Sequence, residues 1–266
     1  MKQIEFAEHV KSAFEKDDTI SGLAVGGSWI TREIDDFSDL DLIVVTREKI
    51  THDKEKMLHY AKQAGNLLSG FTGDHVGEPR LLICLYSTPL LHVDYKFVTI
   101  EEFKARIETP VVLLDKSGEL KKAIEESEPS FPYPDYQWIE DRFWIWIHYA
   151  LLKIGRGEYL EAFDFFSYLR ITVLGPLLHI KNANLPRGVR KVESELDKND
   201  LKSLLSTIPQ YDRNSLLNSL RKTTELYKEL RDELFDGKIN LQKETEEKVM
   251  QYFDQIEKIQ THSRNH

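Results

Sequence analysis

The sequence predicts an α+β protein of two domains, in which a mixed, mostly antiparallel β-sheet flanked by helices precedes an α-helical bundle. Short apolar runs of strand length alternate with helical patterns over residues 1–127. A proline-rich, charged stretch without periodicity follows at 125–134, and beyond it apolar residues recur only with helical spacing. The predicted domains are therefore 1–127 and 128–266.

Composition and charge narrow the class of protein. Of the 266 residues, 41% are hydrophobic and 30% charged, as in folded globular proteins. The net charge of −9 disfavours a general nucleic-acid surface, which would be basic, so nucleic acid is not an expected partner. No apolar run approaches the roughly 20 residues of a membrane helix, and the charged, amphipathic start has no signal-peptide core. We expect a cytoplasmic protein without a membrane partner, and the single Cys84 argues against a disulfide framework.

The first domain carries the strand patterns and the second the long helices. Strands are predicted at 20–25, 39–45, 80–86, 90–98 and 110–114, with helices at 3–15, 29–34, 51–69 and 100–107, a turn at 70–74 and a short helix ending near 126. The second domain is predicted to hold helices at 135–154, 158–181, 213–235 and 242–262, the second interrupted at Gly175-Pro176. The helix from Asp135 to Gly155 is apolar around most of its circumference, so we expect it to be central and buried.

A glycine turn and two carboxylates mark the predicted site. Gly26, Gly27 and Ser28 follow the first strand, and a Gly-Gly turn lets backbone N–H groups approach phosphate oxygens. Asp39 and Asp41 open the next strand one residue apart and so share a face. Their mutual repulsion is relieved by a divalent cation, and Mg²⁺ prefers one or two carboxylates together with substrate phosphates. The stretch predicts half of a site for a metal-bound nucleoside triphosphate.

The strand at 90–98 supplies a third carboxylate. His92, Asp94 and Lys96 alternate with apolar residues and share one face. A lone aspartate is unfavourable in a buried strand unless a metal or a cationic partner is present. Lys96 has two interpretations, contact with a phosphate or pairing with Asp94, and His92 is more often structural than catalytic.

This order of motifs resembles the nucleotidyltransferase superfamily that includes DNA polymerase β, over roughly residues 20–118. The resemblance implies that Ser28 contacts the triphosphate and that three carboxylates hold two divalent ions, taken here as Mg²⁺. Two such ions stabilise both the attacking and the leaving oxygen of an in-line displacement. The residues expected to be catalytic and to bind the metal are Asp39, Asp41 and Asp94; those expected to bind the nucleotide are Gly26, Gly27, Ser28, Lys96 and Lys153.

The helical half of the sequence resembles one particular family of this superfamily. Four stretches resemble the helical domain of aminoglycoside 6-adenylyltransferases, which modify streptomycin-like drugs: 142–144, 149–153, 156–158 and 162–164. That resemblance implies aminoglycoside modification and antibiotic resistance. The family typically has Gly-Ser-Arg and Asp-Tyr-Asp, whereas this chain has Gly-Gly-Ser-Trp and Asp-Leu-Asp. Trp29 therefore stands at the family's arginine position, and Arg142 replaces an acidic residue.

Polar residues of the helical half have two interpretations each. Lys153 lies near a helix end, where the dipole favours a cation, and it could also contact phosphates. Asp164 lies among phenylalanines, so we expect it to be partly buried, pairing with Arg170 or an arginine on another helix, or binding a cationic amine. Glu140 is expected to be a solvated acid of the first helical turn, or else a catalytic base.

These features favour transfer of a nucleoside monophosphate, AMP from ATP, to a hydroxyl of a small polar acceptor such as an aminoglycoside. Asp94 or an acid of the helical domain would be the general base, which contributes roughly 10²–10⁴-fold. Two alternatives remain. One is a nucleotidyltransferase that acts on a protein or an RNA, and the other is a catalytically idle nucleotide-binding module. The sequence predicts no oligomeric state.

Overall fold

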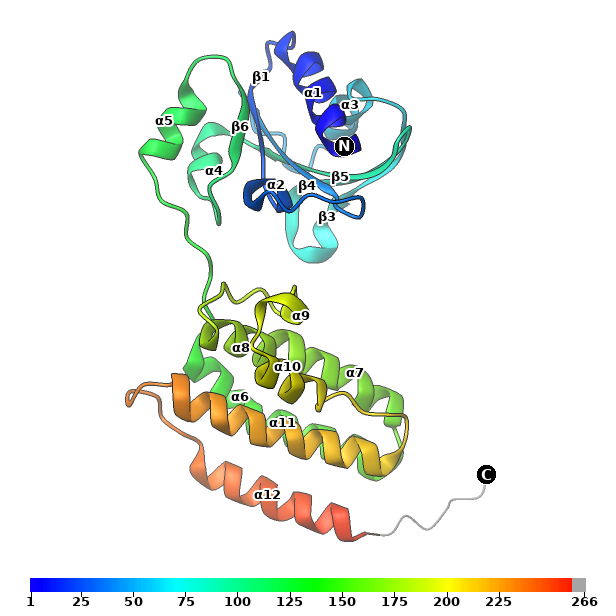
Figure 1. Ribbon diagram of the computed structural model, residues 1–266, viewed down its shortest axis with the longest axis vertical. Helices are drawn as coiled ribbons and strands as arrows, with labels where there is room; N and C mark the ends of the chain where they lie inside the picture. Colours follow the sequence, from blue (N-terminus) through cyan, green and yellow to red (C-terminus); the bar gives the residue numbers. More distant parts are fainter. Residues whose placement is uncertain (260–266) are drawn as a thin grey trace. The chain divides into compact units, whose positions relative to one another are not determined.

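The computed structural model describes residues 1–259 and divides into two compact units, Met1–Phe131 and Pro132–His266 (Figure 1). The first unit extends to Phe131 rather than to residue 127 because Arg106 binds the connecting stretch. Its guanidinium donates to the carbonyl of Ile124 at 3.1 Å and also to Ser127. In return, the backbone N–H of Ser130 donates to the carbonyl of Arg106 at 2.9 Å.

The first unit is built on a six-stranded sheet of order β3-β4-β5-β2-β1-β6. Among the described residues, β2 and β5 pair in parallel, whereas every other adjacent pair is antiparallel. The sheet is mixed and mostly antiparallel, as predicted. The elements are α1 (Lys2–Glu15), β1 (Ile20–Val25), α2 (Ser28–Thr31), β2 (Leu40–Thr46), α3 (Lys54–Gln63), β3 (Leu67–Gly73), the 3₁₀-helix η1 (Asp74–Val76), β4 (Glu78–Ser87), β5 (Leu90–Val98), α4 (Ile100–Lys104), β6 (Val111–Asp115) and α5 (Glu119–Glu125).

Helices cover both faces of this sheet (Figure 1). On one face, α1 and α3 pack through Val10 and Tyr60 into the larger apolar cluster of the unit. On the other face, α4 and α5 bring Phe103 and Leu120 against Val45 and its neighbours. Since strand side chains alternate between faces, each polar residue of β2 and β5 can be assigned to one of these two sides.

The predicted helix at 51–69 and the predicted turn at 70–74 are partly wrong. Helix α3 ends at Gln63, and residues 67–73 form the edge strand β3, which pairs with β4. Gly65, with φ of +148°, interrupts the helix where its apolar pattern continues in the sequence. Leu68, on this strand, is exposed. The prediction failed because the run from Leu67 to Gly73 lacks the alternation that is typical of a strand.

The second unit is helical throughout its regular structure, as predicted for the C-terminal half. The predicted interruption at Gly175-Pro176 is preceded by a π-helical segment, and two short helices before α11 were not predicted. Residues 260–262 of the last predicted helix lie outside the described residues. The elements are α6 (Tyr136–Arg156), α7 (Tyr159–Leu169), η2 (Arg170–Leu174), α8 (Gly175–Lys181), α9 (Val192–Glu195), α10 (Lys198–Leu205), α11 (Arg213–Leu234) and α12 (Lys243–Lys258).

Helix α6 is less buried than predicted. The carboxylate of Asp135 caps its start, as expected, but the helix ends at Arg156 with Gly157 at φ +78° rather than at Gly155. One face packs on α7, α11 and α12. Ile145, at 61% exposure, faces solvent, and Tyr149 is partly exposed where its hydroxyl donates to Glu161 of α7. The helix therefore carries an accessible, partly aromatic face.

Glu140 was predicted to be a solvated first-turn acid, and this is wrong, because its side chain is fully buried. Its carboxylate accepts hydrogen bonds from the Tyr227 hydroxyl at 2.5 Å and from the backbone N–H of Gln242 at 2.9 Å. The indole of Trp144 approaches it at 3.4 Å, and a guanidinium nitrogen of Arg231 lies 3.5 Å away. Buried charges persist when they are paired and hydrogen-bonded, so the contacts from α11 and the α11–α12 loop explain the burial.

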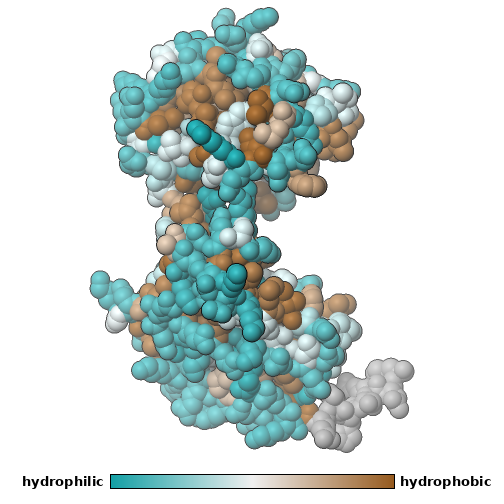
Figure 2. Space-filling model, viewed as in Figure 1, coloured by the Kyte–Doolittle hydropathy of each residue, from teal (hydrophilic) through white to brown (hydrophobic). Residues whose placement is uncertain are grey.

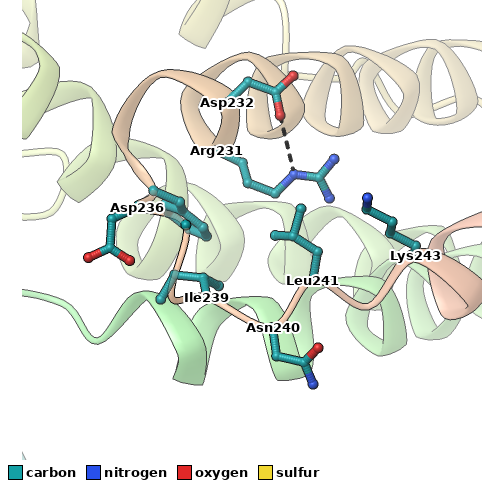
Figure 3. A pocket seen from close by; sticks show the side chains of 9 residues that line it. Arg231, Asp232, Asp236, Ile239, Asn240, Leu241 and Lys243 are labelled. Carbon is teal, nitrogen blue, oxygen red and sulfur yellow. Dashed lines mark ion pairs between the residues drawn. The ribbon is translucent and has the colours of Figure 1, made fainter.

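A hollow of about 650 Å³ adjoins this buried network. Figure 3 shows it at the end of α11, where Arg231 pairs with Asp232 and where Lys243 begins α12. Its wall carries both acidic and basic side chains and includes none of the residues predicted for the site. We interpret it as the open border of the Glu140 network.

The visible surface is mostly hydrophilic with scattered apolar groups (Figure 2). Among the described residues, no helix is both long enough and apolar enough to cross a membrane.

Replacing Glu140 with alanine should lower the free energy of unfolding by about 3 kcal/mol, because Tyr227 and Arg231 lose a buried partner. Urea denaturation followed by tryptophan fluorescence measures this, since Trp138, Trp144 and Trp146 lie in the second unit. The exposed Glu229→Ala on α11 is the control and should change stability little. Equal effects of the two substitutions would contradict a structural role for the Glu140 network.

Candidate active site

The glycine turn closes against the second strand. β1 ends at Val25, and the N–H of Gly26 donates to the carbonyl of Asp41 at 2.9 Å. Gly27 has φ of +61°, a conformation that favours glycine. A β-carbon at Gly27 would lie 2.0 Å from Oδ2 of Asp41. The missing side chain therefore leaves the space that the Asp41 carboxylate occupies.

Strand pairing places two of the predicted carboxylates side by side. In the parallel pair of β2 and β5, Asp41 is the register partner of Asp94. Leu42 and Val93 point to the α1–α3 side, so the alternation places Asp41 and Asp94 on the α4–α5 side. Asp39 lies one residue before β2, not within the strand as predicted. On its other side, Asp94 has Ile83 of β4 as its partner.

Asp94 is largely shielded from solvent, with 22% of its side chain exposed. Burial raises the pKa of its carboxyl above the usual value, and the charge of Asp39 adds to the rise. The hydrogen bond with His92, in which Nε2 lies 2.8 Å from Oδ1 of Asp94, acts in the opposite direction and lowers this pKa. The ionised carboxylate of Asp94 is therefore more basic than a free aspartate.

Lys96 shares the face of Asp94 but pairs elsewhere. Its ammonium lies 3.0 Å from Glu78, so the alternative of an Asp94–Lys96 pair is not what the structure shows. Arg80 binds the same carboxylate with two nitrogens, at 2.6 and 2.7 Å. The hydrogen bond from Arg80 is the largest cause that lowers the pKa of Glu78, and the bond from Lys96 adds to it. Together they outweigh burial and lower this pKa from 4.5 to about 2. Glu78 therefore stays ionised and retains both cations, and a nucleotide-binding role for Lys96 stays a prediction.

The other predicted residues occupy different places. Ser28 is the first residue of α2, directly after the turn, and Trp29 packs against the larger apolar cluster of the first unit. Lys153 belongs to α6 in the second unit and pairs with Glu158 and Glu161, each at 2.9 Å. These two carboxylates, Glu161 first, raise the pKa of Lys153. Its predicted contact with phosphates stays a prediction.

The carboxylates suit a hard cation in their chemistry. In residues 1–259, no group of three or more His, Cys, Asp or Glu side chains is arranged to hold a metal ion. The donors are nevertheless carboxylate oxygens from neighbouring strands, the ligand type that Mg²⁺ prefers. Asp41 and Asp94 thus offer the ligand type from adjacent register positions, with Asp39 just before β2, and metal binding by the three stays a prediction.

Glu108 is a residue of this site that the sequence did not reveal. It lies between α4 and β6, and its Oε1 accepts a hydrogen bond from the N–H of Gly27 at 2.9 Å. Neither its neighbours in the chain nor its spacing from the glycines signals this contact, because 81 residues separate the partners. A carboxylate therefore lies at the turn predicted to bind phosphate.

The second unit contains an aromatic, acidic pocket of about 370 Å³. Tyr168 meets the ring of Trp146 edge to face at 5.3 Å and stacks on Phe165 at 5.6 Å. Asp164 was expected to be partly buried but is exposed on this wall, and Arg170 instead donates to the carbonyl of Thr207. The pocket is lined by Trp146, Tyr149, Glu161, Asp164, Phe165 and Tyr168.

A mixed sheet that carries a glycine turn beside in-register carboxylates is the arrangement of a nucleotidyltransferase. The model of the family described as streptomycin adenylyltransferase matches residues 1–256, so the chain belongs to that family and is an adenylyltransferase.

Two solved structures are similar at low identity. An aminoglycoside 6-adenyltransferase from Bacillus subtilis matches with 16% identity and a TM-score of 0.41, covering 95% of this chain and 98% of that chain. A nucleotidyltransferase-like protein from Exiguobacterium sibiricum matches with 11% identity and a TM-score of 0.36, covering 85% and 74% respectively. A comparison with curated protein sequences gave no match.

In Gly27→Ala the new methyl group displaces the Asp41 carboxylate, so Mg²⁺-ATP should bind at least about tenfold more weakly. A tenfold loss corresponds to only about 1.4 kcal/mol of binding free energy. Gly77→Ala is the matched control, because φ is +74° there and nothing lies within 4 Å of the added carbon. Both variants should lose about 1–2 kcal/mol of stability to left-handed strain. Calorimetric titration and thermal melting separate the two effects; equal ATP affinity in the two variants would refute the steric argument.

Proposed function

We propose that the protein transfers AMP from ATP to a hydroxyl group of a cationic, aminoglycoside-type acceptor and releases pyrophosphate. The observation that carries the proposal is the register of Asp41 with Asp94 beside the Gly26–Gly27 turn. Membership of the adenylyltransferase family supports the reaction type, and the pocket of the second unit supports the acceptor class.

The donor side uses the first unit. Backbone N–H groups of Gly26, Gly27 and Ser28 would bind phosphate oxygens, because a turn with positive φ forms an anion-binding concavity. Asp39, Asp41 and Asp94 would hold Mg²⁺, which supplies neutralisation of phosphate charge and makes an acceptor hydroxyl easier to deprotonate. The site therefore combines main-chain donors for the phosphates with carboxylates for their counter-ions.

The reaction is a displacement at the α-phosphorus. The acceptor oxygen forms a bond to phosphorus while the bond to the β-phosphate oxygen breaks, so pyrophosphate leaves with the electron pair. The hydroxyl proton passes to a base. Asp94 is suited to this role because burial raises the pKa of its carboxyl, and His92 holds that carboxylate at 2.8 Å.

The acceptor side uses the pocket on α6 and α7. Glu161 is already engaged with Tyr149 and Lys153. Asp164, in contrast, makes no ion pair within residues 1–259 and lines the same pocket as Phe165 and Tyr168. An unpaired carboxylate among aromatic faces attracts ammonium or guanidinium groups through both charge and cation–π interaction. This chemistry favours a cationic acceptor over an RNA end.

The first experiment identifies the acceptor. Incubation with labelled ATP, Mg²⁺ and a panel of aminoglycosides that includes streptomycin should transfer label to at least one drug with equimolar pyrophosphate. Replacing a residue that only supports a metal ligand lowers metal affinity or activity about 10- to 100-fold. Asp41→Asn changes a proposed ligand itself, so it should lower turnover at least about 100-fold. Label on protein or RNA instead would support a macromolecular acceptor, and Mg²⁺-ATP binding without turnover would support an idle module.

The second experiment tests the pocket. Asp164→Asn should raise the KM of the modified drug about tenfold, the loss expected for one charge-assisted contact. The kcat and the KM for ATP should stay unchanged, because Asp164 is not among the residues proposed to bind ATP or Mg²⁺. Glu229→Gln removes one charge from an exposed position of the same unit and serves as the control. An unchanged KM in Asp164→Asn would place the acceptor elsewhere.

A further inference from the structure

The glycine turn is in contact with an anionic side chain. Oε1 of Glu108 accepts the N–H of Gly27 at 2.9 Å, and a β-carbon on Gly26 would lie 2.8 Å from the same oxygen. The carboxylate thus lies directly against the turn. Asp41 approaches from the β2 side, where its Oδ2 would be 2.0 Å from a β-carbon on Gly27. Two carboxylates therefore flank the two glycines.

A carboxylate and a phosphate oxygen compete for the same donor. One N–H directed at an acceptor forms one well-aligned hydrogen bond, and hydrogen bonds to charged acceptors are the stronger ones. A phosphate oxygen that takes the N–H of Gly27 has to displace Glu108. The carboxylate would also repel an arriving polyphosphate through its charge.

We infer that Glu108 is a positioning residue that lowers the affinity for nucleotide while it holds the turn ready for an anion. In the nucleotide-free protein its carboxylate orients the N–H of Gly27, and on binding it exchanges that donor for a phosphate oxygen. The inference rests on the proposed function, since it assumes that a triphosphate binds at this turn. It adds a residue that sets how tightly ATP is bound and how readily pyrophosphate leaves.

Two substitutions distinguish competition with phosphate for the N–H of Gly27 from a purely structural role of Glu108 in the turn. Glu108→Gln keeps an oxygen that can accept the N–H of Gly27 but removes the charge, so Mg²⁺-ATP and Mg²⁺-free tripolyphosphate should each bind about five- to tenfold more tightly. Glu108→Ala removes the competitor and the anchor together. This variant should have a lower melting temperature than the unsubstituted protein when no ligand is bound. Tripolyphosphate should raise its melting temperature by more than it raises that of the unsubstituted protein. Glu128→Gln, an exposed change on the same unit, should alter neither quantity.

Calorimetric titration with ATP and with tripolyphosphate decides the outcome. Tighter binding in Glu108→Gln with unchanged affinity in Glu128→Gln is the expected result. Measurable binding by the unsubstituted protein with equal or weaker binding by Glu108→Gln would overturn the inference and leave the proposed function intact. Absence of binding to the unsubstituted protein and to every variant would overturn both.

Discussion

The parallel pairing of β2 with β5 is the constraint on which the candidate site depends. It is the parallel pair among the described strands, and it brings Asp41 into register with Asp94 although they lie far apart in sequence. Antiparallel pairing of β1 with β2 then brings the end of β1 to the same place, where Gly26 bonds to the carbonyl of Asp41. Apolar side chains on the α1–α3 face hold these three strands together. Hydrophobic packing on the opposite face therefore brings the two carboxylates together. Burial is the main reason why the pKa of Asp94 is raised there, and the charge of Asp39 adds to it.

Sequence reasoning succeeded where a feature is encoded locally. Alternation in Leu90–Val98 predicted the strand and the face of Asp94, and the capping residue Asp135 predicted where α6 begins. It failed where distant contacts decide. Glu140 has the sequence context of a solvated acid, and its burial depends on Tyr227 from α11. Glu108 meets Gly27 through a loop whose course no local pattern specifies.

The same distinction applies to the helical unit. The apolar residues of α6 exceed what one buried face needs, so the sequence predicted a helix enclosed on all sides. The structure instead leaves part of that apolar surface accessible beside α7, where aromatic rings and Asp164 form a pocket. An exposed group of aromatic rings is informative because large apolar patches on soluble proteins often mark binding sites. The excess of aromatic residues over packing needs is the sequence signal for this pocket.

The attachment of the connecting stretch to Arg106 determines where the chain can be divided. Its guanidinium bonds to Ile124 and Ser127, and its Nε already lacks a partner in the described part of the chain. Ending a separate first unit at residue 127 would remove Ser130, which returns a bond to the Arg106 carbonyl. A version that ends at Phe131 keeps these contacts and is the form in which this unit alone should be studied.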